Sequence, residues 1–130
     1  MTKPEVTTLK RVRLELARDH DHPTGSRNHG YDFIAPIDDA GHIIVEDWHK
    51  VRERCRVKRF ASGEPDEIGH VVRMPGGSLA FHYDVHGRAD NDESGYRFAV
   101  HSFRPGEYVS IKEHDGVLRT FKVMSVLDVD

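Results

Sequence analysis

The sequence predicts a mainly β protein: a small antiparallel β-barrel or roll of about six or seven strands with one short α-helix. Several stretches alternate apolar and polar residues, which is the period of a half-buried strand, whereas one stretch has the 3.6-residue period of an amphipathic helix. Turn-forming residues recur at short intervals in the second half, as they do in antiparallel sheets. A curled sheet is favoured because several strands with a single helix need closure to cover their inner face and edges.

The first two strands are predicted in the N-terminal third. In residues 8–18, Val12, Leu14 and Leu16 share one face, with charged residues on the other. The segment YDFIAPI, residues 31–37, predicts a second short strand. Pro36 in this segment indicates an edge or a bulge, because proline has no amide hydrogen to donate to a ladder.

The helix follows from a change of period. Ile44, Trp48, Val51 and Cys55 stand at i, i+4, i+7 and i+11, the apolar stripe of one short amphipathic helix. We expect Trp48 to pack over the barrel. Because Cys55 lies on the same stripe, it is expected to be a buried structural thiol rather than a nucleophile.

Strand register in the C-terminal half can be predicted from the burial pattern. A three-residue loop, His114-Asp115-Gly116 with its glycine in the left-handed conformation, places five apolar residues on one face, whereas a two-residue loop would split them. These residues are Val109, Ile111, Val117, Phe121 and Val123. Across the preceding loop, a single register buries three further pairs: Val85 with Tyr96, Tyr83 with Phe98, and Phe81 with Val100.

Length and composition indicate one domain over residues 1–130, with residues 1–7 as a flexible N-terminal segment. A hydrophobic content of 37% is too high for a disordered chain, and no apolar run is long enough for a membrane helix. The first residues lack a signal-peptide pattern, and one cysteine excludes an intramolecular disulfide. We therefore expect a cytoplasmic location and no membrane association.

A basic run, KVRERCRVKRF, spans residues 50–60 and has a formal charge of +5 in a chain whose total is −3. Such a stripe is a candidate for contact with phosphates. The alternative is a solvated face whose charges pair with nearby acidic loops. Because the rest of the chain is acidic and no aromatic residue interleaves with the arginines, nucleic acid is not the expected partner. The candidate basic patch consists of Lys50, Arg52, Arg54, Arg56 and Lys58.

Histidines on the polar face of the strand SLAFHYDVHG, residues 78–87, raise the possibility of a metal or ligand site. The candidate face contains His70, His82, Asp84 and His101. Its completeness depends on the hairpin at residues 74–78. A three-residue loop would set His70 opposite His82, whereas the favoured two-residue loop, Gly76-Gly77, would turn His70 inward toward Tyr83. Polar histidines on a half-exposed face are the competing interpretation.

The connection RDHDHPTGSRNHGYDF carries a second group of candidate ligands. Polar loops of this length are often binding loops or disordered segments. The candidate anion-binding loop contains Arg18, His20, His22, Arg27 and His29. A plain surface loop is the alternative.

One stretch resembles a known family. GHVVRMPGGSLAFH, residues 69–82, is similar to the second motif of cupins in Gly69, Pro75 and Gly77. Ala80 stands where the cupin metal-binding histidine would be, and His82 follows two residues later on the same face. The first cupin motif is absent from the sequence.

Two function classes follow. The first is a non-enzymatic binding or interaction module whose partner is an unknown protein or small molecule. The second is a cupin-like enzyme or small-ligand-binding protein whose histidine face holds a divalent metal, although no cofactor is the stronger expectation. Patterns for a serine nucleophile, a phosphate-binding glycine loop or a zinc-protease helix are absent from the sequence.

Overall fold

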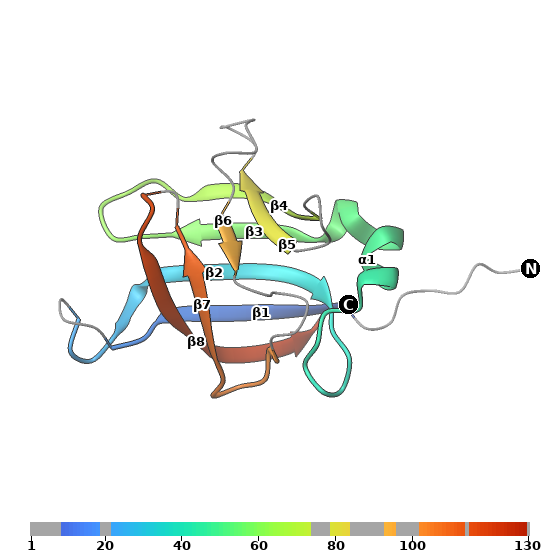
Figure 1. Cartoon of the computed structure of the whole chain (residues 1–130), viewed down its shortest axis with the longest axis horizontal. Coiled ribbons are helices and arrows are strands. Elements are labelled where there is room, and N and C mark those ends of the chain that lie inside the picture. The colour runs from blue at the N-terminus through green and yellow to red at the C-terminus, as the bar shows by residue number, and fades with distance from the viewer. Residues whose placement is uncertain are drawn as a thin grey trace, which may run out of the picture.

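The computed structural model is a closed antiparallel β-barrel with an α-helix at one end (Figure 1). It describes residues 9–18, 22–73, 79–83, 93–95, 102–113 and 115–129. Within these residues the barrel has eight strands, slightly more than the sequence predicts. The mainly β architecture, the antiparallel order and the single short α-helix are confirmed. The N-terminal segment 1–7 lies outside the described residues.

Each strand pairs with the next along the chain, and β1 also pairs with β8 to close the barrel. The strands are β1 (Leu9–Leu16), β2 (Ser26–Pro36), β3 (Arg56–Phe60), β4 (Glu67–Arg73), β5 (Leu79–Tyr83), β6 (Glu93–Gly95), β7 (Tyr108–Lys112) and β8 (Leu118–Asp128).

The N-terminal strands follow the predicted pattern, but β2 is longer than expected. Val12, Leu14 and Leu16 are buried, as the alternation predicts. Strand β2 begins at Ser26, so part of the expected polar loop is β-strand. Pro36 is the last residue of β2 and lies beyond the β2–β3 ladder, which ends at Phe33, so its missing amide hydrogen does not interrupt that ladder.

The predicted helix is α1 (Val45–Val51), followed by a 3-10 turn, η1 (Arg52–Arg54). Trp48 is buried, and its indole N–H donates to the carbonyl oxygen of Val71 at 2.9 Å. Cys55 is fully buried, and burial raises the pKa of its thiol to about 12. Both residues are buried, as predicted, but the helix is shorter than the predicted stripe: Ile44 caps its N-terminus and Cys55 follows the 3-10 turn.

The β7–β8 hairpin has the predicted register. Tyr108 pairs with Lys122 and Val109 pairs with Phe121, which leaves the three-residue loop at 114–116. Gly116 has a φ of 83°, the left-handed conformation that this loop requires. Val117 lies beyond the last ladder pair and is 46% exposed, so only the other four residues of the predicted face are buried.

Two predicted registers are wrong. His70 pairs with His82 and Val71 with Phe81, which is the register of the three-residue alternative and not that of the favoured two-residue loop; residues 74–78 themselves lie outside the described residues. Val71, rather than Val72, fills the core, because the barrel needs only one apolar face from β4. Phe81 pairs with Glu93 rather than Val100, because β6 pairs with β5 through residues that lie earlier in the chain.

Aromatic residues fill the centre of the barrel. The Tyr31 ring lies 5.1 Å from both the Phe81 and Phe121 rings, and Phe33 lies 5.3 Å from Phe103, measured between centroids. Helix α1 follows β2 and precedes β3, so it covers the barrel end where β2 stops and β3 starts (Figure 1). The other end, where β2 starts and β3 stops, is closed by different chemistry.

Removing an aromatic ring from this centre should be costly. We expect Phe81→Ala to lower the free energy of unfolding by about 3 to 5 kcal/mol, because its neighbours cannot fill the cavity. Leu127→Ala, at a position 59% exposed, is the control and should change stability by less than about 0.5 kcal/mol. Urea unfolding curves measure both changes. Equal midpoints for the two variants would contradict the assigned core.

Candidate functional site

The predicted histidine face is assembled only in part. His70 on β4 lies directly opposite His82 on β5, and both side chains are half-buried. Asp84 and His101 lie outside the described residues. Ala80 on β5 pairs with Ser94 on β6. Among the residues described, no group of three or more histidine, cysteine, aspartate or glutamate side chains is placed to hold a metal ion.

A small pocket of about 360 Å³ lies over this histidine pair. Trp48 and Arg52 from the helical segment form one wall, and His70, His82 and Arg73 line it from the sheet. The Arg73 Nη1 atom lies 3.4 Å from the His49 ring nitrogen. The pocket therefore brings part of the histidine face next to one residue of the basic run.

The basic run does not form one continuous patch. Lys50 pairs with Asp47 at 3.8 Å, and Lys58 lies 3.9 Å from Asp32. Arg52 lines the small pocket, whereas Arg54 and Arg56 are exposed. The run crosses α1, η1 and β3, so strand alternation and helical rotation distribute its charges over different faces.

The predicted anion-binding loop is divided between two places. Arg18 and Arg27 are exposed and line a surface groove. His29 lies on β2 and contacts a buried glutamate instead. His22 does not line the groove, and His20 lies outside the described residues.

The buried glutamate is Glu113, which closes the barrel end opposite α1. Its Oε2 atom accepts hydrogen bonds from the Tyr31 hydroxyl at 2.5 Å and from Arg59 Nε at 2.9 Å. Its Oε1 atom accepts from His29 Nε2 at 2.9 Å and from Arg119 Nη1 at 2.8 Å. Four side chains from β2, β3 and β8 thus converge on one carboxylate. We call these five residues the barrel-end cluster.

The electrostatics of the barrel-end cluster keep Glu113 ionised. Burial by itself would raise the pKa of Glu113, but the hydrogen bonds from His29 and Tyr31 and the Arg59 charge outweigh it and lower the pKa to about 2. A carboxylate that stays ionised and fully bonded is a poor proton acceptor. The barrel-end cluster therefore satisfies a buried carboxylate with donors from three other strands.

Sequence reasoning missed the barrel-end cluster, although the alternation contained the signal. Glu113 continues the inward face of Val109 and Ile111, and Arg59 continues that of Val57. Charged residues in phase with a buried face indicate an internal ion pair. Gly30 lets β1 and β2 pack closely here, because a Cβ at this position would lie 2.0 Å from the Leu14 carbonyl oxygen.

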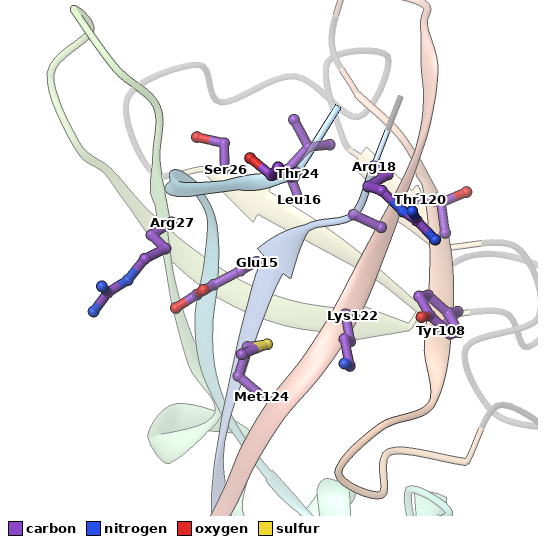
Figure 2. A pocket seen from close by; sticks show the side chains of 12 residues that line it. Glu15, Leu16, Arg18, Thr24, Ser26, Arg27, Tyr108, Thr120, Lys122 and Met124 are labelled. Atoms are coloured by element: carbon purple, nitrogen blue, oxygen red, sulfur yellow. The ribbon is translucent and has the colours of Figure 1, made fainter. Parts of the chain in front are cut away.

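A second and larger recess lies on the outer surface of the barrel, next to this end. It is a groove of about 830 Å³ between the β1–β2 connection and the β7–β8 hairpin (Figure 2). Lys122 pairs across the strands with both Glu15 and Tyr108. The Ala17 amide donates to the Thr120 carbonyl oxygen, which places Arg18 beside this part of β8. Figure 2 shows these side chains around the groove.

The groove has more cationic than acidic side chains. Its cations are Arg18, Arg27 and Lys122, and within the described part of the chain none of them has an ion pair. Its acidic residue, Glu15, is bonded by Arg13 Nε at 3.1 Å. The groove therefore presents three cations beside exposed Tyr108 and Met124.

Comparisons with protein-family models, with curated proteins and with solved structures find no match for this chain. The cupin resemblance in residues 69–82 gains no support from them. In the described ranges, no helix is long and apolar enough to cross a membrane.

Neutralising Glu113 should destabilise the barrel. We expect Glu113→Gln to cost about 3 to 5 kcal/mol, because it leaves the buried Arg59 charge without its carboxylate. Since the folded pKa of about 2 lies below the ordinary 4.5, the wild-type contribution is complete above pH 4.5 and is lost as pH falls toward 2.

Thermal unfolding between pH 2 and pH 7 measures this loss. Glu107→Gln, which removes an exposed carboxylate next to β7, is the control and should follow the wild-type profile. A Glu113→Gln protein as stable as the control variant at pH 7 would contradict a structural role for the cluster.

Proposed function

We propose that this protein is a non-enzymatic binding module and that the groove between the β1–β2 connection and the β7–β8 hairpin is its ligand site. The observation that carries the proposal is the group of three cations without ion pairs, lining a recess of about 830 Å³. Ligand pockets commonly have volumes of about 300 to 1,000 Å³. A site of this size and charge suits an anion.

The lining also suggests what else the ligand carries. Tyr108 is 57% exposed and Met124 is 46% exposed, and both border the groove. Exposed aromatic and thioether surfaces gain free energy when an apolar group covers them. Hydroxyl groups of Thr24, Ser26 and Thr120 add hydrogen-bonding capacity. An amphipathic anion, with an acidic head and an apolar body, uses all three kinds of surface.

The arrangement supports binding rather than catalysis. Catalytic sites bring together a nucleophile or a general base with a partner that activates it. In the groove, the only carboxylate among the described lining residues is held by Arg13, and no cysteine or histidine lines the recess. Glu113, the most strongly perturbed carboxyl group, is inside the barrel.

The small pocket over His70 and His82 supports the second function class. Most of its exposed lining surface is apolar, Arg52 and Arg73 also line it, and it has room for a compact ligand. It places the histidine pair of the sequence prediction beside Trp48. The larger groove is preferred because the one acidic residue of its described lining, Glu15, is paired with Arg13, which leaves three cations in excess, whereas Glu53 lines the small pocket beside Arg52 and Arg73.

Phenylphosphate is a suitable small probe, because it combines a phosphate with an aromatic ring. We expect its addition to the isotope-labelled full chain to shift backbone amide signals near Arg18, Arg27, Tyr108 and Lys122. Binding of so small a ligand should be weak, with a dissociation constant of about 1 mM. The double variant with Arg18→Gln and Lys122→Gln should bind about tenfold more weakly, because two ion pairs are lost.

Arg56→Gln, which removes an exposed cation of the basic run, is the matched control and should leave binding unchanged. Benzyl alcohol, which lacks the charge, should produce no saturable shift. Shifts confined to the surroundings of His70 and His82 would move the site to the small pocket. An absence of saturable shifts from phenylphosphate would overturn the proposal.

A further inference from the structure

The exposed apolar side chains of this protein concentrate on one hairpin. Six large hydrophobic residues are exposed among the described residues, and all except Ile68 lie on β7, on β8 or in the turn that joins them. The five on this hairpin are Tyr108, Val117, Leu118, Met124 and Leu127. Scattered exposed apolar residues are ordinary, but a group on one surface indicates an interaction site.

This surface extends beyond the groove. Leu118, Thr120, Lys122 and Met124 alternate along the outer face of β8, and the last three line the groove. Leu118 is 62% exposed and lies outside the groove, toward the hairpin turn. Because alternate residues of a strand are about 6.6 Å apart, the row from Leu118 to Met124 spans about 20 Å. A small anion that fills the groove would leave Leu118 uncovered.

Resting on the proposed binding function of the groove, we infer that its ligand is an extended acidic and apolar segment of another protein, lying along the outer face of β8. An extended segment has the same spacing between alternate side chains as β8 itself. Acidic side chains would face Lys122 and Arg18, and apolar side chains would cover Leu118, Tyr108 and Met124. The complementary charges select an acidic segment over a basic one.

Two other occupants fit less well. A symmetric dimer through this face would bring Lys122 and Arg18 of one copy toward those of the other, and like charges in contact oppose association. An anionic membrane fits poorly because this surface is concave. The exposed carboxylates of Glu107 and Asp115, on either side of β7, would also repel anionic lipid headgroups. The segment also cannot add as a strand, because β8 already pairs with β1 and β7. Side chains must therefore provide the recognition.

The test uses a peptide of about ten residues, long enough to run along the exposed row. Leucine and glutamate alternate at every second position, and serine occupies the positions between. A second peptide has lysine in place of glutamate. Each is titrated into the isotope-labelled full chain beside phenylphosphate, and vesicles of phosphatidylserine and phosphatidylcholine provide the lipid arm.

The acidic peptide should shift the amide signals of β7 and β8 and bind at least about tenfold more tightly than phenylphosphate. Lys122→Glu should weaken peptide binding by about fivefold or more. Leu118→Ser should weaken the peptide but not phenylphosphate, because Leu118 lies outside the groove. Ile68→Ser, which replaces the exposed apolar residue away from the hairpin, is the matched control and should affect neither.

The outcomes separate the two proposals. If phenylphosphate binds but the acidic peptide binds no more tightly than the lysine peptide, or if Leu118→Ser has no effect, the polypeptide ligand is wrong and the binding function stands. If vesicles bind and displace the peptide, the partner is a lipid surface. If neither phenylphosphate nor the acidic peptide binds, both proposals fail.

Discussion

The structure depends on one buried carboxylate. Glu113 accepts hydrogen bonds from His29 and Tyr31 on β2, from Arg59 on β3 and from Arg119 on β8, so a single side chain links strands that are distant in the sequence. A buried charge is tolerated only when its partners replace the water it loses. The strands must therefore meet in the register that brings these donors together.

The two ends of the barrel are closed by different chemistry, and this difference places the groove. Helix α1 covers one end with the buried side chain of Trp48. The position of this side chain is fixed by apolar packing and by one hydrogen bond to the Val71 carbonyl oxygen. The other end uses inward charges, and Arg119 pairs there with both Glu113 and Asp115. The outward cation of β8 in this region, Lys122, forms no ion pair among the described residues and lines the groove.

The sequence predicted the fold well where one face of a strand is apolar, as at Leu14 and Phe121, because burial fixes the phase of alternation. It failed at β5, where Phe81 was expected to pair with Val100 but pairs with Glu93. Phe81 faces the core with either partner, so the alternation of apolar residues cannot identify the neighbouring strand. Of the candidate site, Arg18 and Arg27 were found from loop composition. Lys122 and Tyr108 were not, because a lysine and a tyrosine on an exposed face resemble any solvated strand, and only closure of the barrel brings them to Arg18.

The short strand β6 is the weakest link in the closed barrel, and its loss would affect how molecules of this protein associate. Among the described residues, strand β6 contributes two residue pairs to β5 and two to β7, whereas β1 contributes eight to β2. Few pairs make β6 the segment whose detachment costs least. Its release would turn a continuous cylinder into an open sheet with unpaired backbone on β5 and β7. Such edges template aggregation and strand exchange between molecules, so closure of the barrel between β5 and β7 depends on the few backbone pairs that β6 makes.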